Sequence, residues 1–189
     1  MKIVSSGISP LVIGFGRFNP PTIGHQSNFD CLNTTWQSVG GASFMLVSRS
    51  YGHTTKNLLS PKEKYKFLDC SFSGTPLIFT NDFQYSIFQI LQEMWKRHDH
   101  LYYICGSDRV EYMTKTLNYY NNKDYFFTEI NVVCSGERNH VSSTLMLECI
   151  KNHDYEGYLK LVPANLLADS EKCQEMYEIL RQRIDKPRS

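Results

Sequence analysis

The sequence carries almost no net charge and contains no long apolar run. Its 189 residues include 20 Lys and Arg against 19 Asp and Glu, which gives a formal charge of +1. Proteins that bind duplex nucleic acid or a membrane surface through charge need an excess of basic residues. No run approaches the roughly 20 apolar residues of a membrane-spanning helix, and no apolar segment typical of a signal peptide follows Met1. We therefore expect a cytoplasmic protein that binds neither a long nucleic acid nor a membrane.

Cysteine-based metal and redox motifs are absent as well. No two of the six cysteines have C-x-x-C spacing, and Cys105 and Cys134 lie inside apolar runs. This placement favours buried thiols in a reducing compartment over disulfides. His98 and His100 flank Asp99, but an H-D-H triplet in a loop is more often solvated than metal-bound. No metal site is predicted.

Short apolar runs alternate with segments of helical period along most of the chain. With 41% hydrophobic and 21% charged residues, the composition is that of a folded globular protein. Runs of three to five apolar or nearly apolar residues suit strands buried on both faces, as in a parallel sheet. They lie at residues 11–15, 43–47, 77–79, 101–105 and 130–134. The predicted fold class is α/β, a Rossmann-like open parallel sheet of about five strands with helices on both faces.

The helical segments include one with a clear start signal. Ser60 can cap a helix, Pro61 suits its first turn and Glu63 can bond back to the cap amide. Apolar residues recur at helical spacing in residues 29–39, 65–72, 87–95 and 173–184. We expect one domain over residues 1–155 and a C-terminal helical extension over residues 156–189, packed on that domain.

The first apolar run leads directly into residues 16–25, which read G-R-F-N-P-P-T-I-G-H. Ligands of open parallel sheets bind beyond the carboxyl ends of the strands. Thr22 and His25 share one face of a helix start, whose amides favour phosphate, and Arg17 is close in sequence. The segment therefore predicts a phosphate site, although a stiff surface loop with a capping threonine fits the same residues. No Walker lysine motif and no G-x-G-x-x-G motif occur.

These residues resemble the first signature of the nucleotidylyltransferase superfamily, (H/T)-x-G-H preceded by G-x-F-x-P. Residues 22–25 match it in its threonine variant, and residues 16–20 are similar to the form found in archaeal-type nicotinamide-nucleotide adenylyltransferases. The resemblance continues through a basic loop and helix at residues 56–64, a G-x-D segment at residues 106–108, and residues 141–144, which resemble the start of I-S-S-T-x-x-R. Overall the sequence is most similar to versions encoded by tailed bacteriophages.

One position departs from this family pattern. The last signature should end in arginine, but its position holds Leu147. In the family, that arginine reaches the β and γ phosphates of the nucleoside triphosphate. Lys151, one turn further along the same helix face, is one substitute, and Arg109 and Arg138 are others. The sequence leaves the choice among them open.

The resemblance implies transfer of a nucleotidyl group, with attack of a substrate phosphate on the α-phosphorus of the triphosphate. The nucleophile is already an anion, so catalysis consists of positioning and charge stabilisation. The implied catalytic residues are His25, Thr22, Arg17 and Lys56. Mg²⁺ would be held mainly by the triphosphate of ATP and by water. The implied nucleotide-binding residues are Gly16, Phe18, Gly24, Gly106, Asp108, Ser142, Ser143 and Thr144.

The leading functional expectation is transfer of AMP from ATP to a phosphorylated small molecule such as nicotinamide mononucleotide, with release of pyrophosphate. A cytidylyltransferase acting on a small phosphorylated alcohol is an alternative, although residues 137–141 match that subfamily's R-T-x-G-I-S-T pattern poorly. A third reading is a degenerate member that serves as a structural or interaction module, for example in a phage particle. The partners are then virion proteins instead of substrates in a host cytoplasm. The sequence leaves a homo-oligomer open in every case.

Overall fold

A computed structural model describes residues 9–52, 57–80, 86–137 and 141–184. The chain forms a five-stranded, all-parallel sheet with the strand order β3-β2-β1-β4-β5. This confirms the predicted Rossmann-like α/β class, and each apolar run of the sequence becomes one strand. The strands are β1 Pro10–Gly16, β2 Ala42–Val47, β3 Leu77–Phe79, β4 His100–Cys105 and β5 Glu129–Cys134.

Strand β1 lies at the centre of the sheet, hydrogen-bonded to β2 on one side and β4 on the other. Its first five residues are all buried because helices cover both faces. The chain adds β2 and β3 on one side of β1 and then crosses over to add β4 and β5 on the other. This reversal of strand order creates a crevice between the carboxyl ends of β1 and β4, where ligands of such sheets bind.

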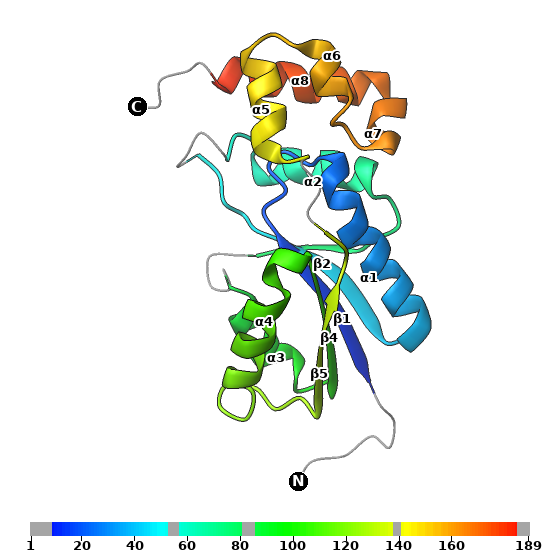
Figure 1. Cartoon of the computed structure of the whole chain (residues 1–189), viewed down its shortest axis with the longest axis vertical. Helices are drawn as coiled ribbons and strands as arrows, with labels where there is room; N and C mark the ends of the chain where they lie inside the picture. Colours follow the sequence, from blue (N-terminus) through cyan, green and yellow to red (C-terminus); the bar gives the residue numbers. More distant parts are fainter. Residues whose placement is uncertain (1–8, 53–56, 81–85, 138–140, 185–189) are drawn as a thin grey trace.

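Two pairs of helices cover the sheet (Figure 1). Helices α1 Gln26–Val39 and α2 Pro61–Ser71 share a core with one face, and α3 Ile87–Met94 and α4 Ser107–Tyr120 share a core with the other. Helix α2 begins in the predicted capping box. The Ser60 hydroxyl accepts a hydrogen bond from the Glu63 amide at 3.3 Å, and the Glu63 carboxylate accepts one from the Ser60 amide at 2.8 Å.

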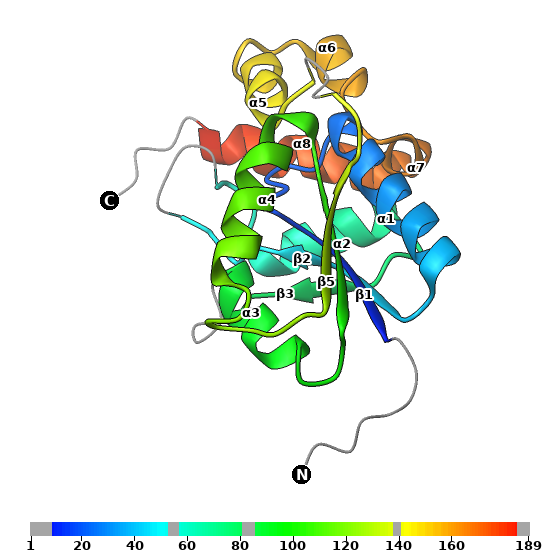
Figure 2. The ribbon, with the colours of Figure 1, turned by 60° about the horizontal axis from the view of Figure 1, so that its bottom comes forward.

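The C-terminal helices form a cap beyond the carboxyl ends of the strands, drawn in yellow to red in Figures 1 and 2. The cap consists of α5 Ser143–Lys151, α6 Tyr155–Leu159, α7 Ala164–Ala168 and α8 Ser170–Ile184. It shares one apolar core with α2. The predicted boundary between residues 155 and 156 falls inside α6, and α5 packs on α6 and α8. The helices beyond the carboxyl ends of the strands begin with α5. None of the helices in the described segments is long and apolar enough to cross a membrane.

Candidate functional site

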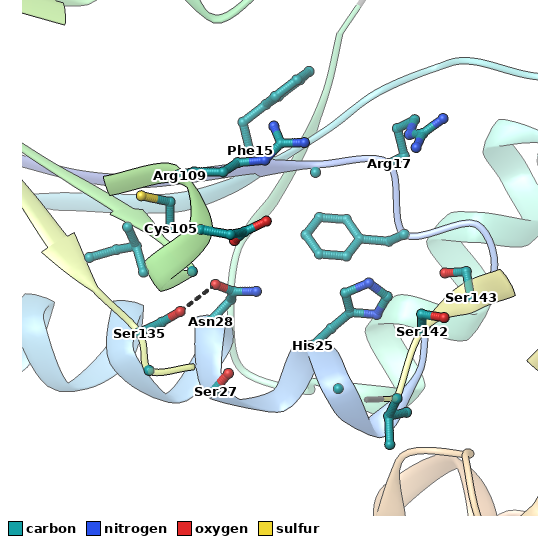
Figure 3. Close-up of a pocket in the computed structure, with 18 of the residues that line it drawn as sticks. Phe15, Arg17, His25, Ser27, Asn28, Cys105, Arg109, Ser135, Ser142 and Ser143 are labelled. Carbon is teal, nitrogen blue, oxygen red and sulfur yellow. Dashed lines mark hydrogen bonds between the residues drawn. The ribbon is translucent and has the colours of Figure 1, made fainter. Parts of the chain in front are cut away.

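A cavity of about 380 Å³ opens at the crevice between β1 and β4. Its wall comes from the loop after β1, the starts of α1, α4 and α5, and the loop after β5. Segments that lie far apart in the sequence therefore meet at one edge of the sheet (Figure 3). The predicted site residues that line the cavity are Gly16, Arg17, Phe18, Gly24, His25, Gly106, Asp108, Arg109, Ser142, Ser143 and Thr144.

His25 lies in a short 3-10 turn, Ile23–His25, that leads into α1. The Thr22 amide donates a hydrogen bond to His25 Nδ1 at 3.0 Å, so Nδ1 acts as the acceptor. In a neutral imidazole, the hydrogen is then carried by Nε2. The edge of the Phe18 ring packs against the imidazole, with the ring centroids 5.0 Å apart. The turn thus fixes both the orientation and the tautomer of a hydrogen-bond donor at the cavity.

Thr22 itself is fully buried and is not part of the cavity wall. Its hydroxyl oxygen lies 3.2 Å from His25 Nδ1. Thr22, predicted as a catalytic residue, is therefore placed behind the cavity and beside His25. Its contacts with the imidazole give it a role in orienting His25.

The loop after β1 is held by contacts that explain its composition. Phe18 has a φ of 47°, and its ring folds back over Gly16. A Cβ atom at Gly16 would lie 2.4 Å from that ring, so any side chain there would displace the Phe18 ring. The buried Asn19 side chain donates to the Leu59 carbonyl at 3.1 Å and accepts from the Leu59 amide at 2.9 Å. The loop is thereby fastened to the segment that precedes α2.

The start of α5 packs directly against the His25 turn. A Cβ atom at Gly24 would lie 2.4 Å from the Val141 carbonyl oxygen, so this close approach requires glycine. The Ser143 hydroxyl donates to the Pro20 carbonyl at 2.8 Å, and the Ser142 hydroxyl caps the helix by accepting from the Leu145 amide at 3.2 Å. The hydroxyls of these two predicted nucleotide-binding residues therefore each make a hydrogen bond within the protein. The amides of Ser143 and Thr144, at the positive dipole end of α5, are groups that can bind an anion.

Charged side chains line the opposite part of the cavity. Figure 3 shows Arg17 and Arg109 across the cavity from His25. The carboxylates of Asp108, in the first turn of α4, and Glu137, in the loop after β5, lie in the same wall. Burial raises the pKa of the Cys105 thiol in this wall to about 11, so the group is neutral at physiological pH. The cavity wall thus contains both arginines and carboxylates, together with a neutral Cys105 thiol.

Leu147 and the residues predicted to replace the missing arginine differ in whether they line the cavity. Leu147 lines the cavity with one edge and packs into the apolar core of the cap. Lys151 is exposed at the end of α5 and is not part of the cavity wall. Arg109 is part of that wall, whereas Arg138 lies outside the described residues, as does Lys56. Among the described substitutes, only Arg109 is brought to the cavity.

The structure adds cavity residues that the sequence reasoning missed. The Ser135 hydroxyl, after β5, donates to the Asn28 side-chain oxygen at 2.7 Å (Figure 3). Asn28 follows His25 by three residues, so a search for polar residues on the same helix face would have found it. Ser135 and Glu137 follow the fifth apolar run directly, where the carboxyl-end rule already predicts ligand contacts.

A further missed residue lies just behind the cavity. Lys64, in the first turns of α2, is fully buried and donates hydrogen bonds to the carbonyl oxygens of Ser48 and, at 3.0 Å, Ser50. Burial, together with the positive charge of Arg17, lowers the pKa of Lys64 from 10.5 to about 8. A buried cation close to Arg17 raises the positive potential at this end of the sheet.

The comparisons with known proteins concern the fold. The sequence matches no protein-family model and no curated protein. Among solved structures, it is similar to a macrolide-efflux protein from Streptococcus pneumoniae, with a TM-score of 0.51 and 21% sequence identity. The likeness covers 82% of this chain and 57% of that one, so the chain spans little more than half the length of this neighbour. At this identity the likeness supports the parallel α/β architecture and carries no function with it.

Proposed function

We propose that the protein is a nucleotidylyltransferase that transfers AMP from ATP to a phosphorylated small molecule, with nicotinamide mononucleotide the first acceptor to test. The observation that carries the proposal is the junction of the His25 turn with the start of α5 at the carboxyl end of the sheet. This junction offers an imidazole donor and helix-start amides to an anionic ligand, and two arginines lie across the cavity from it. A dedicated phosphate site explains why both Gly24 and the Ser143–Pro20 bond hold the two elements so close.

In this reaction the residues of the chain act by positioning and by charge. His25 donates from Nε2 to the phosphates, and Arg17 and Arg109 stabilise the negative charge that develops on the α-phosphate and the leaving pyrophosphate. The amides of Ser143 and Thr144 bind the outer phosphates. The acceptor phosphate is already ionised, so no general base is required. Mg²⁺ enters with ATP as part of the substrate, because it prefers phosphate oxygens and water as ligands.

A degenerate fold that binds partners without catalysis is the alternative, and Leu147 is the observation that favours it. The leucine places an apolar side chain where the resembled family has a phosphate-binding arginine. Under this alternative the cavity is a remnant, and no acceptor is turned over.

Pyrophosphate release separates the two functions. The protein is mixed with Mg²⁺, each nucleoside triphosphate and a panel of phosphorylated acceptors that includes nicotinamide mononucleotide. We expect release that requires both ATP and an acceptor, and a loss of about 100-fold or more in His25→Ala, since one preorganised donor contributes that much to charge stabilisation. Absence of turnover with every acceptor, in the wild type and in Leu147→Arg, would exclude the enzyme. Turnover that His25→Ala leaves unchanged would exclude this site.

A further inference from the structure

The Lys64 ammonium group is a buried cation whose described acceptors are carbonyl oxygens. Its side chain is fully buried, and its bonds run to Ser48 and Ser50, in the loop that follows β2. Burying a charge is costly unless it is paired. The adjacent Glu63 does not pair with it, because its carboxylate accepts two hydrogen bonds from the Arg183 guanidinium and one from the Ser60 amide.

Lys64 connects the two loops at the carboxyl ends of β1 and β2. The Ser48 amide donates to the Gly16 carbonyl at 3.0 Å, immediately before Arg17. Lys64 holds the Ser48 carbonyl from the other side. The backbone that carries Arg17 into the cavity is thus tied, through Ser48, to the buried ammonium group.

Burial lowers the pKa of Lys64, and repulsion by the positive charge of Arg17 lowers it further. Other ionisable groups on the surrounding elements include Lys62 and Glu63 on α2, Arg49 and Tyr51 in the loop after β2, and Arg183 on α8. The repulsion falls when an anion binds at Arg17, because the anion attracts both cations.

We propose that Lys64 is a positioning residue, which holds the Ser48–Ser50 loop and keeps a positive charge behind Arg17 so that an anionic substrate group binds there. The proposal rests on the proposed function only in taking ATP as the ligand. Lys64 does not touch the ligand and acts through Arg17 and the loop. By linkage, the anion that binds at Arg17 favours the protonated form of Lys64, so loss of that proton weakens binding.

Three variants test this role by ATP affinity, measured by titration calorimetry at pH 7 and pH 9. In the wild type we expect the affinity to fall by on the order of tenfold between these values, as for a ligand that raises one pKa by about one unit. Lys64→Arg stays charged, so its affinity should stay constant over this range. Lys64→Met should bind about tenfold more weakly at pH 7 and show no further fall. Lys66→Met is the matched control, because Lys66 lies on the same helix in an exposed ion pair with Glu175; it should behave as the wild type.

The outcomes distinguish this role from the proposed function. If the wild type binds neither ATP nor pyrophosphate, the nucleotide site and the role of Lys64 are both overturned. If the wild type binds ATP and folded Lys64→Met binds it equally well at pH 7, only the role of Lys64 is overturned. Should Lys64→Met fail to fold, Lys64→Arg decides, because the same fall with pH in this variant and in the wild type contradicts the proposal.

Discussion

At the scale of single residues, the cavity depends on side chains that bond to the backbone behind it. Asn19 pairs with both backbone groups of Leu59, and the Thr22 amide fixes the tautomer of His25. The Asn19–Leu59 bonds connect segments that are 40 residues apart in the sequence. They fix the positions of groups that line the cavity, as in a preorganised electrostatic site.

Lys64 also makes the stability of the fold depend on pH. Its pKa is about 8 in the folded chain and 10.5 as a free side chain, so above about pH 8 the unfolded state binds more protons. The cost of burying the charge is therefore present in full below about pH 8 and is relieved as pH rises toward 10.5. We expect the free energy of unfolding of the wild type, relative to Lys64→Met, to rise by at most about 2 kcal/mol between pH 8 and pH 9.5.

Urea unfolding of both proteins at a series of pH values measures this difference. The comparison with Lys64→Met removes the contribution of the buried Cys105 thiol, whose raised pKa lowers stability over part of the same range. A difference that stays constant, or that falls with pH, would show that Lys64 is not a buried cation in solution.

Prediction from the sequence was most successful for features that depend on a few neighbouring residues, such as a helix cap or a glycine in a tight turn. The Ser60–Glu63 capping box and the glycines at positions 16 and 24 were identified from spacing and motif alone. The sequence could not show that Thr22 turns inward, or that Lys64 is buried while Lys151 is exposed. A lysine in the first turn of a helix is usually solvated. Lys64 is buried because the loop after β2 packs over it, and local sequence does not encode that contact.

At the scale of elements, the site depends on how closely two helix starts approach. The His25 turn and the segment before α5 are in contact at Gly24, where a Cβ atom would lie 2.4 Å from the Val141 carbonyl. A methyl group cannot be accommodated against a rigid carbonyl, so the two elements must separate. The helix-start amides of α5 and His25 would then no longer lie at the same part of the cavity wall.

Gly24→Ala is therefore expected to destabilise the fold by about 1–3 kcal/mol, the usual cost of overpacking a tight contact, and to weaken ATP binding. Urea unfolding and titration calorimetry provide the two measurements. The matched control is Gln26→Ala, two residues further on, which removes only an exposed hydrogen bond to Asp30 and should change stability by less than about 0.5 kcal/mol. If Gly24→Ala equals this control in both measurements, the close approach is not required.

At the scale of the whole molecule, the sheet was predictable and the cap was less so. Five apolar runs with helical segments between them leave few topologies other than a parallel sheet. The extent of the cap could not be predicted, because α5 has the same local pattern as a sheet-covering helix yet packs on α6 and α8. Its tertiary neighbours, which local periodicity does not encode, determine that placement.

Arg183 joins the cap to the sheet part. On α8, its guanidinium donates to Leu58 O at 2.7 Å and to both carboxylate oxygens of Glu63. The Leu58–Leu59 segment in turn holds Asn19. Arg183→Met leaves these partly buried acceptors without their donor, so we expect a loss of about 1–3 kcal/mol in the free energy of unfolding. Lys66→Met removes an exposed α2–α8 ion pair instead and should cost less than about 1 kcal/mol.

Fluorescence and circular dichroism together show whether the loss of stability in Arg183→Met affects both the cap and the sheet part. Both tryptophans, Trp36 and Trp95, lie in the sheet part, so their fluorescence reports on that part, whereas circular dichroism reports on all helices. Because the cap shares one apolar core with α2, the urea midpoints from both probes should shift together in Arg183→Met. A shift in circular dichroism without one in fluorescence would mean that the cap unfolds separately. In that case α8 would not hold the loop after β1 through Leu58 and Asn19, and truncating α8 would leave ATP affinity unchanged.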